Sequence, residues 1–230
     1  ISQPETRPPD FLNHHRASQR KMDHQPSKIR RSRGFSIIEL MIVITIMGML
    51  VGVTLGGVLP MLHAYRLSSS AGQLQADLAY GSQLSGKLNV PIEFRFYRHD
   101  DLNSGRNLKA FRSYQLVKRD GKTGDVIPLN RITHFEIGIV IHELENFSGI
   151  LDIGEQDAGQ QDPTIPLGNQ TSDEYSYIEI QYRPDGSTTL PKDKIWCVTL
   201  VNENRADEDI LPENFRTLVI NPVTGSVRKY

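Results

Sequence analysis

Residues 33–60 read RGFSIIELMIVITIMGMLVGVTLGGVLP, and the rest of the chain is organised around this stretch. Between Ile37 and Leu59 there are 23 residues, and only Glu39 among them carries an ionisable side chain. A helix of that length extends roughly 34 Å, which is enough to cross the hydrocarbon core of a bilayer. The stretch therefore predicts a transmembrane helix that has an unusual carboxylate near its start.

The charge of the chain is divided across this stretch. Residues 1–34 hold eight Lys or Arg against three Asp or Glu, a balance of +5, whereas residues 35–230 hold 18 against 24, a balance of −6. A basic segment before an apolar span indicates a cytoplasmic N-terminus and an exported C-terminal part. That larger part lacks a basic stripe, so we do not expect it to bind nucleic acid. The basic residues nearest the span are Lys28, Arg30, Arg31 and Arg33.

The segments on either side of the span differ in character. Residues 1–34 are rich in Pro, His, Gln, Ser and Arg, and we expect them to be a disordered leader because they have little apolar surface to bury. After Pro60, apolar residues recur at the spacing of one helix face, namely Leu67, Ala71, Leu74 and Leu78. We therefore expect residues 35–60 to form the membrane half of a long helix and residues 61–87 its amphipathic continuation.

From residue 88 to residue 230 the periodicity becomes that of β-strands. Turn signals separate several of the strands, as at 120–121, 184–187 and 221–225. A polar, Gly-rich stretch at 152–172 is interpreted as an exposed loop. The expected fold class is α+β, with a long N-terminal helix followed by a mainly antiparallel sheet or sandwich-like head. The candidate strands are 90–97, 111–118, 135–142, 177–182, 195–201, 217–220 and 225–229.

The start of the apolar span resembles a known processing signal. The octapeptide Arg33-Gly34-Phe35-Ser36-Ile37-Ile38-Glu39-Leu40 is similar to the cleavage and methylation signature of type IV prepilins and type II secretion pseudopilins. In that family a membrane-embedded prepilin peptidase cuts after the Gly and N-methylates the new terminal residue. The resemblance implies cleavage between Gly34 and Phe35, methylation of Phe35, and a pilin-like fold.

Glu39 is the residue that the resemblance explains best. A carboxylate inside a membrane helix costs about 2.5–3.5 kcal/mol on insertion scales, so it should have a partner. Cleavage after Gly34 would create an α-amine on Phe35 that is largely protonated at neutral pH. In the family's filaments this pair is formed between neighbouring subunits. Without the Gly-Phe junction, Glu39 would instead be interpreted as a carboxylate that reaches the interface of a plain anchor.

Three glycines lie deeper in the span. Gly48, Gly52 and Gly56 are four residues apart, and such a face lets helix backbones approach closely in a bundle. Many family members have Pro at the position of Gly56, whereas this chain has Pro60 instead.

The C-terminal part shows a weaker resemblance. The segments 182–187 (YRPDGS) and 218–228 (LVINPVTGSVR) look like those of H-type minor pseudopilins. That resemblance implies a β-sandwich-like head in which an aromatic-x-Pro-x-Gly turn joins two strands.

The sequence offers little support for an enzyme or a metal site. It has no G-x-S-x-G, HExxH or P-loop motif, so we expect no catalytic residues and no cofactor. The single cysteine, Cys197, cannot form an internal disulfide and is expected to be a small buried residue of a strand. His134 and His142 lack a third ligand nearby. The acidic residues of the 152–172 stretch do not have the spacing of an EF-hand.

Two functions from different classes remain at this point. The first is a minor pseudopilin or minor pilin, held in the bacterial inner membrane with its head in the periplasm and then inserted into a filament. Its partners would be prepilin peptidase, other pilin-like subunits and an inner-membrane assembly platform. The alternative is an unprocessed, single-pass membrane-anchored β domain that serves as a binding module.

Overall fold

A computed structural model of the protein describes residues 34–101, 109–157 and 175–230, and for residues 53–59 it describes the backbone alone. Its first element is the helix α1 (Ile37–Leu88), with Pro60 inside it. The helix ends at Leu88, one residue beyond the predicted continuation at 61–87. Asn89 follows in the left-handed region (φ 52°), which is a common way to terminate a helix. From Met49 onward the chain forms one compact unit.

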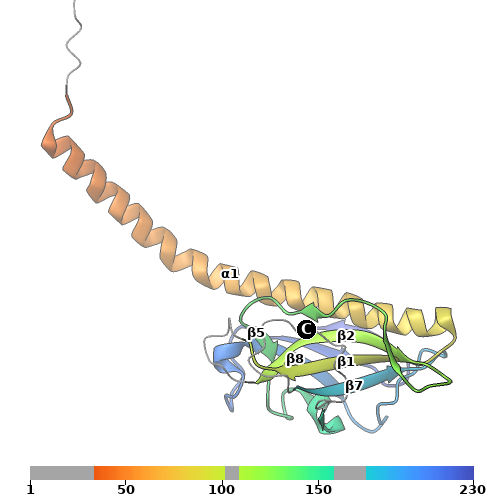
Figure 1. The fold of residues 1–230 in the computed structure, drawn as a ribbon. Coiled ribbons are helices and arrows are strands. Elements are labelled where there is room, and N and C mark those ends of the chain that lie inside the picture. Colours follow the sequence, from red (N-terminus) through yellow and green to blue (C-terminus); the bar gives the residue numbers. More distant parts are fainter. Residues whose placement is uncertain (1–33, 102–108, 158–174) are drawn as a thin grey trace, which may run out of the picture. The chain divides into compact units, whose positions relative to one another are not determined.

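Within the described residues, the head contains two antiparallel sheets (Figure 1). The first sheet has the order β3-β2-β1-β7-β6, with β4 paired to β2, and the second has the order β10-β9-β8-β5. The strands of the first sheet are β1 (Ile92–His99), β2 (Ala110–Arg119), β3 (Val126–Pro128), β4 (Thr133–His134), β6 (Gln156–Asp157) and β7 (Ser176–Tyr182). Those of the second are β5 (Ile139–Ile141), β8 (Trp196–Asn202), β9 (Arg216–Ile220) and β10 (Val227–Lys229), and two short 3-10 helices, η1 (Gly149–Ile153) and η2 (Glu203–Arg205), complete the head. The predicted α+β class with antiparallel pairing is therefore confirmed.

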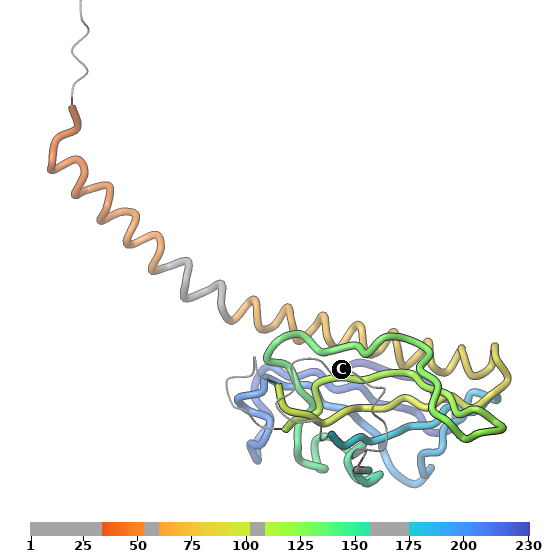
Figure 2. The backbone as a smooth tube through the Cα atoms, in the orientation of Figure 1, coloured from red at the N-terminus to blue at the C-terminus, as the bar shows by residue number. Residues whose placement is uncertain are grey.

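The second half of α1 packs along the sheets with the face that the sequence predicts. Its four apolar positions are at most 2 % exposed, namely Leu67, Ala71, Leu74 and Leu78. They share one core cluster with side chains from both sheets, such as Phe94 of β1 and Val198 of β8. The C-terminal strand β10 returns to the helix, where Gln75 Nε2 donates to Val227 O at 3.3 Å, and Figure 2 traces this return. Burial of this apolar face accounts for the position of the helix on the head.

Two of the sequence predictions are wrong in detail. The predicted strand 135–142 shortens to β5, because Gly138 adopts a left-handed conformation (φ 82°) that breaks the extended backbone before Ile139. The stretch 152–172 does not begin as a loop, because its first residues complete η1 and the next form β6, which pairs with β7. Residues 158–174 lie outside the described residues. The other predicted strands are present with shifts of one or two residues at their ends.

The two C-terminal turns pack against each other and against α1. Gly186 (φ 85°) and Gly225 (φ 64°) both occupy the left-handed region, where a side chain is strained. A Cβ atom on Gly225 would lie 2.5 Å from the carbonyl oxygen of Gly186, so the turns can approach this closely only because residue 225 is glycine. The helix secures the first turn, since Ser85 Oγ donates to the Arg183 carbonyl at 2.9 Å.

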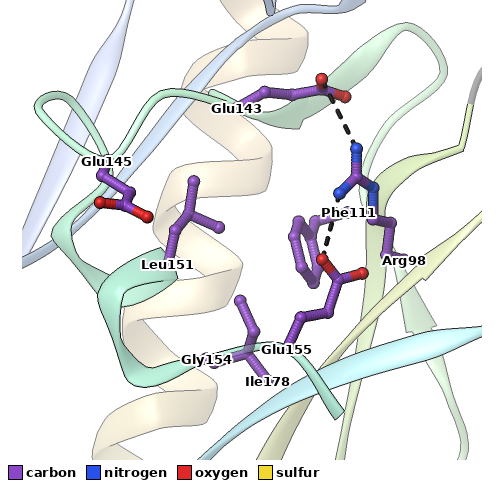
Figure 3. A pocket seen from close by; sticks show the side chains of 8 residues that line it. All are labelled: Arg98, Phe111, Glu143, Glu145, Leu151, Gly154, Glu155 and Ile178. Carbon is purple, nitrogen blue, oxygen red and sulfur yellow. Dashed lines mark hydrogen bonds and ion pairs between the residues drawn. The ribbon is translucent and has the colours of Figure 1, made fainter. Parts of the chain in front are cut away.

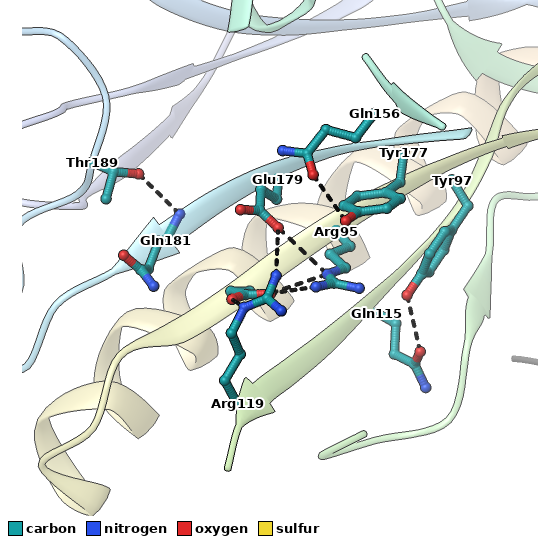
Figure 4. A network of polar contacts seen from close by, with 10 residues as sticks. Arg95, Tyr97, Gln115, Arg119, Gln156, Tyr177, Glu179, Gln181 and Thr189 are labelled. Carbon is teal, nitrogen blue, oxygen red and sulfur yellow. Dashed lines mark hydrogen bonds and ion pairs between the residues drawn. The ribbon is translucent and has the colours of Figure 1, made fainter. Parts of the chain in front are cut away.

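Ionic side chains cover the face of β1 that points away from the core (Figure 4). Arg95 Nη2 lies 2.6 Å from Glu93 Oε2, and both side chains are almost fully buried. Arg119 Nε donates to the other oxygen of Glu93 at 2.7 Å, and Arg95 Nε lies 3.6 Å from Glu179 Oε2. The guanidinium carbon of Arg95 stands 4.5 Å from the ring centroid of Tyr177. Each buried charge therefore has an opposite charge beside it, as burial requires.

The stability of the head is expected to depend on pH through Glu179. Burial, followed by the nearby Glu93 carboxylate, raises the pKa of Glu179 above its ordinary value of 4.5, and Arg95 and Arg119 offset this only in part. The native state then binds more protons than the unfolded chain, so this group's contribution is complete below about pH 4.5 and is lost as pH rises through the folded pKa. Denaturant unfolding of wild type and Glu179→Gln between pH 4 and 8 measures how the free energy of unfolding of each protein depends on pH. We expect the free energy of unfolding of wild type to fall relative to that of Glu179→Gln as the pH rises. If the free energies of unfolding of wild type and Glu179→Gln change in parallel with pH, the expectation is contradicted.

Two buried tyrosines are expected to respond in opposite ways to the loss of their hydroxyl. Tyr114 Oη donates to Asp77 Oδ2 at 2.8 Å, and this bond joins β2 to α1. The Tyr182 hydroxyl is also buried, but it has no hydrogen-bond partner in the part of the chain that the structure describes. Tyr114→Phe should therefore lower the free energy of unfolding by about 1.5–3 kcal/mol, whereas Tyr182→Phe should leave it unchanged or slightly higher. Denaturant unfolding of the full chain in detergent compares the two variants with wild type. Equal losses in the free energy of unfolding for Tyr114→Phe and Tyr182→Phe would contradict this prediction.

Candidate processing and assembly site

The predicted cleavage point lies just before α1, in exposed chain outside the helix. Gly34, Phe35 and Ser36 precede the helix, which begins at Ile37. The first helical hydrogen bond runs from the Leu40 backbone N–H to the Ser36 carbonyl at 3.1 Å. A Cβ added to Gly34 would meet no atom within 4 Å. The bond between Gly34 and Phe35 is thus open to an enzyme, with no part of the described chain packed over Gly34.

The side chains around this point are also exposed. Phe35 is 81 % exposed, although a large aromatic side chain of this kind is normally buried. Glu39 lies in the first turn of α1, where its negative charge is favourable beside the free backbone N–H groups of the helix start. One residue, Ser36, separates Phe35 from the first helical residue. An amine formed on Phe35 would therefore lie close to the turn that carries Glu39.

The apolar side chains that follow are exposed. The large hydrophobic residues between Ile37 and Val51 are 40–80 % exposed. Gly48 and Gly52 would each accept a Cβ without meeting any atom within 4 Å, and Gly56 lies among the residues with undescribed side chains. Exposed apolar surface of this extent marks contact with a membrane or with other proteins.

The predicted membrane half of the helix, 35–60, includes residues 53–59, whose side chains the structure does not describe. Among the described side chains, which leave out those of residues 53–59, no helix is long and apolar enough to cross a membrane.

The remaining sequence-predicted residues either fall outside the described residues or belong to the head. Lys28, Arg30, Arg31 and Arg33, with the rest of the predicted leader before Gly34, fall outside the described residues. Cys197 on β8 is half-buried, and its Sγ accepts from the Gly149 backbone N–H at 3.4 Å. Among the described residues, no three His, Cys, Asp or Glu side chains gather as a metal site.

The comparisons with known proteins bear first on the N-terminal segment. Residues 29–55 match the family model described as the prokaryotic N-terminal methylation motif. The chain carries a prokaryotic N-terminal methylation motif. The prepilin-like resemblance between Arg33 and Leu40 is thereby confirmed. The motif covers the end of the basic leader, the Gly34-Phe35 junction, Glu39 and the first part of α1.

Two solved structures are similar to the greater part of the chain. The type IV minor pilin FimU of Pseudomonas aeruginosa matches with 11 % identity and a TM-score of 0.38, over 71 % of this chain and 87 % of that one. The minor pseudopilin EpsH from the type 2 secretion system of Vibrio cholerae matches with 8 % identity and a TM-score of 0.39, over 72 % and 96 %. Both TM-scores are below 0.5, so neither likeness assigns the function of the head. No curated protein sequence matches the chain significantly.

One residue of the methylation motif was not singled out from the sequence. Ser36 precedes the first helical residue, and its carbonyl accepts the first bond of α1. A signal for it was present, because Ser directly before an apolar helical run is a common helix start. The predicted processing and pairing residues are its neighbours in the motif.

Proposed function

We propose that this chain is the precursor of a pilin-like structural subunit, a minor pseudopilin or minor pilin of a type II secretion or type IV pilus-like filament. In this proposal, prepilin peptidase cleaves after Gly34 and N-methylates Phe35. The leader charges Lys28, Arg30, Arg31 and Arg33 hold the precursor's N-terminus on the cytoplasmic side of the inner membrane. The match of residues 29–55 to the methylation motif carries the proposal.

The geometry around the junction supports the processing step. A peptidase needs an extended and accessible substrate, and residues 34–36 precede the helix and are exposed. The open space around Gly34 means that nothing in the described chain has to move before the bond is reached. Phe35, which is 81 % exposed, is equally accessible to the enzyme that transfers the methyl group.

The exposed first part of α1 supports the assembly step. In a membrane its apolar side chains contact lipid, and in a filament they contact the same segments of neighbouring subunits. Gly48, Gly52 and Gly56 let those helices approach closely. Glu39 then pairs with the Phe35 amine of a neighbour, because a carboxylate in apolar surroundings requires a positive partner. The head carries no catalytic role in this proposal and is displayed on the filament.

The proposal is tested by co-expressing the full chain with a prepilin peptidase and measuring the intact mass of the membrane-bound product. The expected product lacks residues 1–34 and carries one methyl group on its N-terminal Phe35. An active-site variant of the peptidase serves as the control and should leave the precursor intact. A chain that remains uncut beside an active peptidase would favour the alternative, an unprocessed single-pass anchor for a β-domain binding module.

A further inference from the structure

A pocket with a volume of about 310 Å³ opens on the head (Figure 3). Four elements line it: Arg98 comes from β1, Phe111 from β2, Ile178 from β7 and Leu151 from η1. The volume is at the small end of the range of ligand pockets. It suits one long side chain better than a cofactor.

The base of the pocket is apolar and belongs to the rigid core. Phe111 and Ile178 are each 2 % exposed, and both are members of the main hydrophobic cluster. Leu151 packs against the same cluster and is half-buried. A ligand in this pocket therefore rests on hydrocarbon that the sheet and η1 hold in place.

The rim of the pocket is negatively charged. Glu143, Glu145 and Glu155 line it with a single cation, Arg98, so three carboxylates and one guanidinium give a net charge of −2. Arg98 Nη1 donates to Glu155 at 3.1 Å, and its Nη2 lies 3.6 Å from Glu143. In the part of the chain that the structure describes, no hydrogen bond or ion pair engages the Glu145 side chain.

Arg98 is held where it is and does not turn towards Glu145. Its Nε donates to the Lys109 carbonyl at 3.3 Å, and its guanidinium carbon lies 5.7 Å from the Phe111 ring centroid. Lys194 lies within electrostatic reach of Glu145, but its ammonium group forms its ion pair with Asp152. The pocket thus keeps one carboxylate available above an apolar base.

We propose that this pocket receives the side chain of an arginine or a lysine from another protein. The aliphatic stem of such a side chain would pack on Leu151 and Ile178, while its charged end would reach Glu145. A carboxylate or phosphate ligand is disfavoured by the net charge. A bare divalent cation would need several converging oxygens, and no three acidic or histidine side chains converge among the described residues. The proposal is independent of the processing at Gly34.

The test uses the full-length protein in detergent micelles, labelled at its Ile and Leu methyl groups for NMR. The probes are the blocked tripeptides Gly-Arg-Gly and Gly-Lys-Gly, with Gly-norleucine-Gly and Gly-Glu-Gly as matched controls. We expect the two basic peptides to shift the Ile178 and Leu151 methyl signals in a saturable manner that weakens as salt is added. Glu145→Gln should raise the dissociation constant by about twofold to fivefold, and Glu145→Lys should abolish binding. The control Glu213→Gln, an exposed carboxylate outside the pocket, should leave it unchanged.

Each other outcome overturns the proposal. Equal shifts with the norleucine peptide would show an apolar pocket without charge selection. Shifts caused by Ca²⁺ alone, at concentrations where the basic peptides cause none, would show a metal site. The absence of any saturable shift would show that basic side chains do not bind. Because Glu145 lies at the rim and not in the core, its variants test binding without threatening the fold.

Discussion

Gly34→Ala is expected to leave the precursor uncut when the full chain is co-expressed with prepilin peptidase. The added methyl group meets no atom of the described chain within 4 Å, so the variant should fold as wild type does. A loss of cleavage would then report on the fit of residue 34 in the peptidase. We expect the cleaved fraction to fall from nearly all of the protein to almost none, measured by intact mass.

Gly48→Ala is the matched control for that experiment. It adds the same methyl group to another glycine with open space around it, 14 positions further along the chain and inside α1. The control should be cut as efficiently as wild type. Normal cleavage of Gly34→Ala would contradict the assignment of the cleavage site, whereas failure of both variants would indicate a general defect of insertion.

Glu39→Gln should be cut and methylated normally but should enter filaments at least about tenfold less often than wild type. The change removes the charge and keeps the size of the side chain, and the neighbour's Phe35 amine is then left without a partner in apolar surroundings. Breaking a buried ion pair by removing one partner costs about 3–5 kcal/mol, more than enough for this effect. Quantitative mass spectrometry of sheared filaments, from cells that express the assembly machinery, measures the incorporation.

Glu136→Gln provides the comparison for Glu39. This carboxylate is exposed on the head, so removing its charge should not alter incorporation. If Glu39→Gln enters filaments as well as this control does, the proposed pairing of Glu39 with the Phe35 amine is wrong. Failure of cleavage in Glu39→Gln would instead assign the carboxylate a role in recognition by the peptidase.

The parts of the protein that the sequence predicts correctly depend on residues that are near one another along the chain. The methylation motif lies within residues 29–55, and its Gly-Phe junction and Glu39 are read directly from eight consecutive residues. The buried face of α1 follows from the helical period, since each member of the face is three or four residues from the next. The turns at 184–187 and 221–225 are equally local, because glycine supplies the left-handed conformation that each requires.

The polar features of the head depend on residues that are distant in sequence, and only the tertiary structure brings them together. Glu93 and Arg119 are 26 positions apart, and Arg98 and Glu155 are 57 apart. No periodicity links such pairs, because strand order and register decide which side chains face each other across a sheet. The sequence thus determined the helix, its methylation motif and its apolar face. The fold decided which charges are buried in pairs and which carboxylate, Glu145, is left open at the rim of a pocket.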